Sequence, residues 1–460
     1  MIKKLSAYLP LYPSIIVIVL ACLTIIQIHL NLVKYRNDDV IKWDVTGYYS
    51  YLPATFIDKD VTLSFISPEN KSFYSGTRYA YSDDLNGNHL LKYPMGMSVL
   101  YAPFFLKAHV LTPLLGYPQD GFSDIYEMFI EFSGLFYLLF GLWYLRKLLL
   151  CFYSEKVVAL TLTFVFFGTN LLYYATVEPA MSHAYTFSLF SIFLYFSYGF
   201  YQKVSWNNTI IMAVCFGLII LVRPLNVLFI LVFILFGITS LKDLKQRISF
   251  FSNHIKYLLT FLFIVFLIIL PQFLYYKHVT GNYFVFSYGD EKFYFNQFHL
   301  FDFLFGFRKG WLVYTPIMAF AIYGIWCMTN QIRKFRFVIV LLLLVYVYLL
   351  SSWWCWWYGG SFSQRAMIDL YPLLSLTLAA LLFQMSDFNK LKKGTIYAAL
   401  FFCLFLNIFQ TVQYKYNIID YDGMTAKEYF KVFGSIDPSV IDTTLLDKPD
   451  YEQAVKGMPE

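Results

Sequence analysis

Charged residues are scarce in this chain, and their scarcity sets the first limit on its class. Asp, Glu, Lys and Arg together make up 14% of the 460 residues, whereas hydrophobic residues make up 59% and aromatic residues 22%. A soluble domain carries roughly 25% charged residues, so a soluble globular class is excluded. Lipid is the expected solvent for most of the chain.

Cysteine is also sparse, and the six cysteines form no recognisable pattern. They are scattered, without a CxxC pair or a Cys/His spacing that fits zinc. The sequence therefore predicts neither a disulfide framework nor a zinc site. A basic stripe is missing as well, because the lysines and arginines behind the net charge of +6 lie in short clusters between apolar runs. This dispersal argues against nucleic acid as a partner.

Long apolar runs are what the chain has in abundance. A bilayer core of roughly 30 Å needs about 20 apolar residues per helix, and such runs, separated by charge, are typical of spanning helices. The first run, from Ser14 to Val33, lacks the cleavage site of a signal peptide and is expected to be retained. We predict an all-α polytopic membrane protein with about eleven transmembrane helices, near residues 14–33, 126–145, 157–175, 182–201, 208–222, 224–240, 257–276, 311–329, 337–352, 366–385 and 395–413.

Basic residues orient these spans. With the N-terminus in the cytoplasm, the inward loops hold most of the lysines and arginines, as the positive-inside rule expects. The C-terminus is then extracytoplasmic, and the plasma (inner) membrane is the expected location. Residues 1–415 form the predicted transmembrane domain, and residues 416–460 form a short extracytoplasmic tail.

A large first extracytoplasmic loop, residues 34–125, separates the first two spans. Within it, residues 95–115 are apolar but contain two prolines, a lysine and a histidine. A span at this place would also move the later basic clusters outside. We therefore expect an interfacial helix lying on the membrane, and a second one at residues 48–57.

Ionisable residues gather at one predicted rim of the bundle, the outer one. Transporters instead place such groups near the bilayer midplane, often on interrupted helices in paired repeats. The one-sided rim favours an enzyme that acts at the membrane surface on a lipid-borne substrate. The residues of this rim are Asp38, Asp39, Asp44, Glu178, His183, Arg223, Asp290, Glu291, Arg308, Lys309 and Arg365.

Three segments carry a resemblance to a known family. They are Trp43-Asp44 followed by Tyr48, KYPMGMSVLYAPF from Lys92 to Phe104, and WWYGGSFSQR from Trp356 to Arg365 with Tyr371-Pro372 after it. With the helix layout of most of the chain, they resemble the GT-C superfamily of polyprenyl-phosphate-sugar-dependent glycosyltransferases. This superfamily includes the protein O-mannosyltransferases and the lipid A aminoarabinose transferases. The chain has Asp44-Val45 where the mannosyltransferase pattern has a paired Asp-Glu.

The resemblance implies transfer of a sugar, with inversion, from a polyprenyl-phosphate donor to a glycan, lipid or protein acceptor on the extracytoplasmic face. It assigns Asp44 to the acceptor, as a general base. Glu178 and His183, in a short outer turn, are candidates to line the same cavity. There Glu178 would orient the acceptor or hold a divalent metal together with Asp44. The plain alternatives are a solvated loop carboxylate at Asp44 and a hydrogen-bonded histidine at a helix end.

Positive side chains are the candidates to bind the donor phosphate. Negative charge develops on the departing lipid phosphate, and an oriented guanidinium stabilises that charge. Arg365 and Arg223 are the main candidates, with Lys309 beside them, and snorkelling to lipid headgroups is the alternative. The candidate sugar or lipid contacts are Tyr48, Trp357 and Tyr358, for which an interfacial aromatic belt is the plainer explanation.

Two functions from other classes stay open beside the glycosyltransferase. One is a transporter or flippase of lipid-linked saccharide. The other is a catalytically inactive subunit of an envelope-assembly complex.

Overall fold

In a computed structural model of the chain, the described residues are 12–35, 40–67, 69–75, 78–82 and 88–458, and most of them are helical. The regular strands in these ranges are β1 (Tyr81–Ser82) and β2 (Leu90–Leu91), which pair antiparallel. The predicted all-helical class is therefore confirmed.

Six helices are long and apolar enough to cross a membrane, which makes this a multi-pass helical membrane protein. Two of them contain a 3-10 turn at their start, so each is described by two or three consecutive elements. They are α2 (Pro13–Tyr35), α7 (Asp124–Leu150), α14 (Ile255–Thr280), η3 with α18 (Asn330–Phe335, Arg336–Ser351), η4 with α19 and η5 (Arg365–Leu370, Tyr371–Gln384, Met385–Asp387), and α20 (Lys390–Lys415).

The other predicted spans are also helical, but they are short, broken or less apolar. One of them, predicted at residues 224–240, consists of a 3-10 helix that begins at Pro224 and a six-residue α-helix that ends at Leu235. The count of eleven crossings therefore stays a prediction. The helices at these places are α8 and α9 (Glu155–Phe167, Leu171–Thr176), α10 (Ser182–Gln202), α11 (Trp206–Val222), η2 and α12 (Pro224–Phe229, Ile230–Leu235), and α16 and α17 (Trp311–Tyr314, Ile317–Cys327).

The first outer loop has helices at both segments where the sequence predicts them, residues 48–57 and 95–115. It forms α3 (Asp44–Tyr49), α4 (Tyr51–Phe56), α5 (Lys71–Tyr74), α6 (Gly96–Leu111) and η1 (Pro113–Leu115). A Cβ added at Gly96 would lie 2.4 Å from the carbonyl carbon of Leu221, so glycine allows the start of α6 to touch the end of α11. This contact brings the outer loop beside the residue that follows α11, Arg223.

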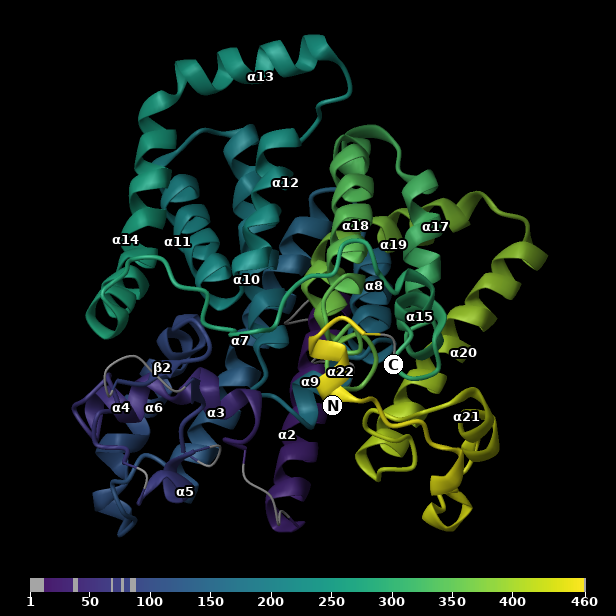
Figure 1. The fold of residues 1–460 in the computed structure, drawn as a ribbon. Helices are drawn as coiled ribbons and strands as arrows, with labels where there is room; N and C mark the ends of the chain where they lie inside the picture. Colours follow the sequence, from purple (N-terminus) through teal and green to yellow (C-terminus); the bar gives the residue numbers. More distant parts are fainter. Residues whose placement is uncertain (1–11, 36–39, 68, 76–77, 83–87, 459–460) are drawn as a thin grey trace, which may run out of the picture.

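The basic helix α13 (Leu241–Asn253) and the C-terminal segment lie at opposite ends of the bundle (Figure 1). This amphipathic helix, which contains Lys242, Lys245 and Arg247, crosses the ends of α12 and α14 at the top of Figure 1. Helices α3 to α6 and the C-terminal segment lie at the bottom of the same view. The side chains considered below all belong to this lower end, which we call the outer end.

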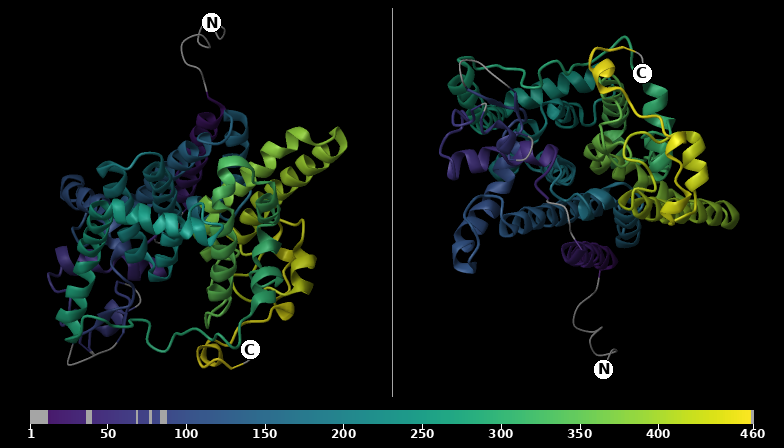
Figure 2. Two further views of the ribbon diagram at one scale, coloured as in Figure 1. Left: turned by 90° about the horizontal axis from the view of Figure 1, so that it is seen from above. Right: turned by 60° about the horizontal axis from the view of Figure 1, so that its bottom comes forward.

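The C-terminal segment folds back onto the outer end. It contains α21 (Ala426–Val432), η6 (Pro438–Val440), η7 (Thr443–Leu445) and α22 (Tyr451–Val455), and it lies near α15 (Leu300–Phe305) (Figure 2). Nε2 of Gln413 in α20 donates to the carbonyls of Val432 and Ser435, each at 2.8 Å. These hydrogen bonds connect the C-terminal segment to the helical bundle.

Candidate functional site

Ionisable side chains from distant segments of the chain converge at the outer end. They come from the start of α3, the turn before α10, the first turn of α10, the residue after α11 and the start of η4. Helix ends meet at the rim of a bundle, so residues far apart in the sequence become neighbours there. We call this group the outer cluster, and its members are Asp44, Tyr48, Glu178, His183, Arg223 and Arg365.

A short ion pair joins Asp44 and Arg365. Nη2 of Arg365 donates to Oδ2 of Asp44 at 2.8 Å, and the Tyr93 hydroxyl donates to Oδ1 at 2.7 Å. Burial raises the pKa of the Asp44 carboxyl, but the charge of Arg365 and the two hydrogen bonds outweigh burial and lower this pKa below its ordinary value. Asp44 is therefore a charged carboxylate held in a fixed orientation, and not a freely solvated loop residue.

Arg365 keeps donor capacity that no described residue uses. Its Nε is buried without a hydrogen-bond partner, and so are both amide atoms of the preceding Gln364. A buried polar atom without a partner costs about 1–3 kcal/mol, so such atoms are expected to find water or a polar ligand. The start of η4 is thus a place where an added polar group would be stabilised.

A second ion-paired group lies deeper and contains Arg223. Nη1 of Arg223 is 3.6 Å from Oδ2 of Asp369, and Nη2 lies 3.5 Å from Nε2 of His183. His183 and Asp369 also face each other, with 3.6 Å between Nδ1 and Oδ1. Both of these side chains are fully buried. His183 therefore contacts Arg223 from the protein interior and has no open face of its own.

Asp369 is fixed by further hydrogen bonds from two helices. Nδ2 of Asn226 donates to its Oδ2 at 3.0 Å, and the Tyr346 hydroxyl donates to the same oxygen at 3.2 Å. The Tyr346 hydroxyl also lies 2.8 Å from Oδ1 of Asn226. A buried carboxylate with this many donors remains oriented, and it orients the guanidinium beside it.

Two aromatic candidates lie at the outer cluster. Tyr48 is 5% exposed, and the charges of Asp44, Arg223 and Arg365 all act on its hydroxyl, so it stands between the two ion pairs. The hydroxyl of Tyr358 feels the charges of the same two arginines. The predicted contacts Tyr48 and Tyr358 are therefore brought together with the predicted cations.

Glu178 lies at the edge of the cluster, in the turn between α9 and α10. The Tyr173 hydroxyl donates to its Oε1 at 3.2 Å. Burial raises the pKa of the Glu178 carboxyl, and the charge of Arg365 opposes burial without cancelling it. Glu178 thus binds a proton more readily than an ordinary glutamate, whereas Asp44 binds one less readily than an ordinary aspartate.

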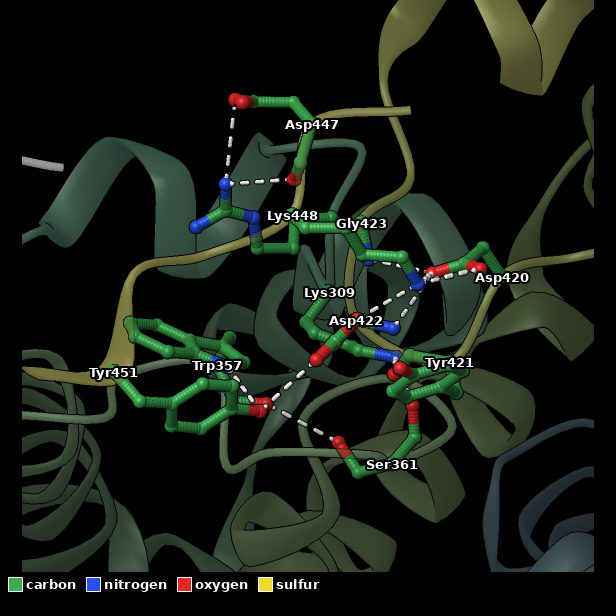
Figure 3. Close-up of polar contacts among 11 residues, drawn as sticks. Lys309, Trp357, Ser361, Asp420, Tyr421, Asp422, Gly423, Asp447, Lys448 and Tyr451 are labelled. Carbon is green, nitrogen blue, oxygen red and sulfur yellow. Dashed lines mark hydrogen bonds and ion pairs between the residues drawn. The ribbon is translucent and has the colours of Figure 1, made fainter. Parts of the chain in front are cut away.

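The structure corrects two of the predicted contacts, Lys309 and Trp357. The ammonium of Lys309 donates to the carbonyls of Ser361 and Tyr421, so it is occupied within the protein and is not offered to a donor phosphate (Figure 3). Trp357 is fully buried, and its Nε1 donates to the Tyr451 hydroxyl at 3.4 Å. No face of this indole is open to a sugar or to lipid.

The outer cluster, as far as the structure describes it, contains no preformed set of metal ligands. Among the residues with a described placement, no group of three or more His, Cys, Asp or Glu side chains is arranged to hold a metal ion. The rim residues Asp38 and Asp39 lie outside the described residues.

Sequence reasoning missed Asp369 and Tyr93, although the first had a detectable signal. Asp369 is an isolated carboxylate within the predicted span 366–385, and a charged group inside a span is by default a functional candidate. Tyr93 belongs to the KYPMG segment, but nothing in its sequence context distinguishes it from the many other tyrosines of the chain. Its role depends on a contact across the outer loop.

Comparison with known proteins does not identify this chain. No protein-family model matches it, and a search of curated proteins finds no match.

Proposed function

We propose that the protein is a membrane glycosyltransferase that moves a sugar from a polyprenyl-phosphate donor to an acceptor at the outer end of the bundle. One observation carries the proposal: a charged carboxylate and two guanidiniums, predicted from three distant segments, lie together at one end of a multi-pass helical bundle. The donor lipid would remain in the bilayer, and its phosphate and sugar would enter the outer cluster.

Asp44 acts as the general base in this proposal. The acceptor hydroxyl gives its proton to the Asp44 carboxylate while its oxygen bonds to the anomeric carbon of the sugar. The bond between that carbon and the phosphate oxygen breaks, and both of its electrons leave with the polyprenyl phosphate. The attack from the opposite side inverts the anomeric centre.

The two arginines stabilise the charge that develops on the leaving phosphate. Arg365 offers its unpaired Nε, and Arg223 is held in place by Asp369 and His183. Arg365 also neutralises Asp44 before substrate arrives. A phosphate bound at Arg365 would compete with Asp44 for this guanidinium and so raise the basicity of Asp44 at the moment the donor is in place.

The membrane arrangement belongs to the same proposal. We propose eleven crossings, a cytoplasmic N-terminus, an extracytoplasmic C-terminus and a location in the plasma membrane. The basic helix α13 lies at the end opposite the outer cluster, which agrees with this orientation under the positive-inside rule.

A transporter of lipid-linked saccharide is the second candidate, and one observation favours it. Asp369, Arg223 and His183 form a charged group among helices of the bundle, and such groups mark substrate paths in transporters. A transporter would move the labelled lipid across a proteoliposome membrane without breaking the bond to the sugar. A glycosyltransferase would release polyprenyl phosphate.

The experiment is a donor-turnover assay with the purified protein in nanodiscs. Release of polyprenyl phosphate from a radiolabelled polyprenyl-phosphate sugar is measured with membrane extract as the source of acceptor. Wild type should turn over donor, and Asp44→Asn should lose at least the roughly 10²-fold typical of a lost general base. Asp290→Asn, a matched change at an exposed outer-loop carboxylate, should remain near wild type. Equal rates for all three proteins would contradict the proposal.

A further inference from the structure

The loop that carries Arg365 is strained. It connects α18 to η4, and within it Tyr358 and Ser363 have φ values of 59° and 57°, beside Gly359 at 65°. Left-handed backbone costs a non-glycine residue roughly 1–2 kcal/mol, and it persists only where the surroundings fix it. Two such residues a few positions before Arg365 imply that something else holds this loop in shape.

Lys309 is the side chain that reaches both the loop and the C-terminal segment. Its side chain is buried, and its ammonium donates to the carbonyl of Ser361 in the loop and to that of Tyr421 in the C-terminal segment (Figure 3). These carbonyls lie 60 positions apart in the sequence. A single side chain thus joins the loop to the C-terminal segment.

A second hydrogen-bonded connection joins the loop to the C-terminal segment. The Tyr451 hydroxyl accepts from Nε1 of Trp357 at 3.4 Å and donates to Asp422 at 3.0 Å. Lys448 holds the C-terminal segment together from within, by ion pairs to Asp420 at 2.7 Å and to Asp422 at 3.0 Å. Ion pairs within the C-terminal segment therefore stabilise its conformation, and the hydrogen bonds of Lys309 and Tyr451 connect the segment to the loop.

The environment of Lys309 suits a structural donor better than a ligand for a charged substrate. Burial lowers its pKa to about 7; Asp422 and Asp420 oppose this shift, and Arg365 and Lys448 add to it. The ring of Tyr414 also lies 5.1 Å from the nitrogen. A neutral amine still carries two N–H groups, which match the two carbonyls, so the bridge holds in either protonation state.

We propose that Lys309 is a positioning residue, which pins the strained loop under the C-terminal segment and thereby holds Arg365 toward Asp44. The C-terminal segment is then part of the machinery of the outer cluster. We call the contacts of Lys309 with the loop and the C-terminal segment the clamp. The effect of the clamp on sugar transfer rests on the proposed function, whereas its effect on the loop conformation does not.

The test compares Lys309→Met with Lys431→Met. Methionine is unbranched and close to lysine in volume but has no donor. The control removes a lysine of the C-terminal segment that pairs with Asp442 at 2.8 Å and contacts neither the loop nor Tyr421. We expect Lys309→Met to lower the kcat for transfer at least ~10-fold, because a displacement of about 1 Å in a catalytic group costs up to ~10²-fold. The KM for acceptor should stay unchanged, and Lys431→Met should stay within about 3-fold of wild type. Equal losses in the two variants would overturn the proposal.

Hydrogen exchange of residues 357–364 gives a readout that does not depend on activity. Exchange should speed up at least ~10-fold in Lys309→Met and stay unchanged in Lys431→Met. If neither variant alters exchange there, the clamp is refuted. If exchange responds as expected but wild type transfers no sugar, the clamp stands and the proposed function fails.

Tyr451→Phe covers the case in which Lys309→Met does not fold. It removes only the hydroxyl that accepts from Trp357 and donates to Asp422, at a partly exposed position. It should raise exchange of residues 357–364 and lower kcat by about 2–5-fold, consistent with the loss of one hydrogen bond. Wild-type exchange and wild-type kcat in Tyr451→Phe would then overturn the proposal.

Discussion

The ion pair between Asp44 and Arg365 can be separated into a structural and a catalytic contribution by a double-mutant cycle. Asp44→Asn keeps the shape and an acceptor for Tyr93 but removes the charge, and Arg365→Gln removes the opposing charge. Each single variant leaves its partner as an unpaired, partly buried charge. The double variant leaves two neutral side chains that can still hydrogen-bond.

The structure sets the expected magnitude between two limits. Exposed ion pairs contribute about 0–1 kcal/mol, and breaking a buried pair costs about 3–5 kcal/mol. The side chains of Arg365 and Asp44 are 13% and 27% exposed, and the contact distance is 2.8 Å. We therefore expect each single variant to lose about 2 kcal/mol of stability, and the double variant to show a coupling of about 1–2 kcal/mol in the cycle.

The pH dependence of the Asp44→Asn effect has a definite sign. The folded protein holds the pKa of Asp44 below the ordinary value of 3.8, so the carboxylate contributes stability above that pH. This contribution is lost as the pH falls through the lowered folded-state pKa. The gap in thermal stability between wild type and Asp44→Asn should therefore be fully present at neutral pH and close in acid.

The assays are thermal unfolding in detergent and donor turnover, measured on the same preparations. We expect the double variant to recover stability relative to either single variant while transfer stays at least ~10²-fold below wild type. Stability and transfer that recover together would show that Asp44 serves only the fold. Wild-type transfer by a folded Asp44→Asn would refute the base assignment.

Three further predictions concern the cation, the second carboxyl and the topology. Arg365→Lys keeps the charge but loses the planar fork, so donor turnover should fall, and Arg365→Ala should fall further. Wild-type rates in both variants would show that Arg365 does not bind the donor. Glu178 has a raised pKa, so protonated Glu178 contributes stability below its ordinary value of 4.5, and this is lost as the pH rises through the folded-state pKa. Glu178→Gln should therefore melt higher than wild type at pH 7, with the gap closing toward pH 4, and an unchanged melting temperature at pH 7 would contradict this. Single cysteines at Ser75, Gly281 and Ser435 should react with a membrane-impermeant thiol reagent in intact cells, whereas single cysteines at Ser240 and Lys392 should not. The reverse pattern would invert the topology.

Much of the helical fold followed from the sequence because apolar runs and their charged interruptions are local signals. The predicted interfacial segments 48–57 and 95–115 are helical, as α3, α4 and α6. The number of crossings did not follow, because breaks such as Pro224 and the turn between α8 and α9 divide apolar runs into pieces shorter than a bilayer. Length and composition alone cannot decide whether such pieces cross.

The candidate site followed in part, for the same physical reason. Asp44, Arg223 and Arg365 could be grouped because charges at the ends of apolar runs share one rim. Their pairing could not be predicted, since it depends on how α3 and η4 meet. The occupied ammonium of Lys309 and the buried indole of Trp357 were missed because both depend on the C-terminal segment, whose fold over the rim has no local sequence signal.

The identity of the lipid that copurifies with the protein tests the central claim most directly. Native mass spectrometry of the wild type in a mild detergent should detect a polyprenyl phosphate or its sugar-linked form, and Arg365→Ala should bind at least ~10-fold less, because a charge-assisted contact contributes about 1.5–3 kcal/mol. Phospholipid alone on the wild type, or an equal amount of polyprenyl phosphate on Arg365→Ala, would contradict the proposed donor site.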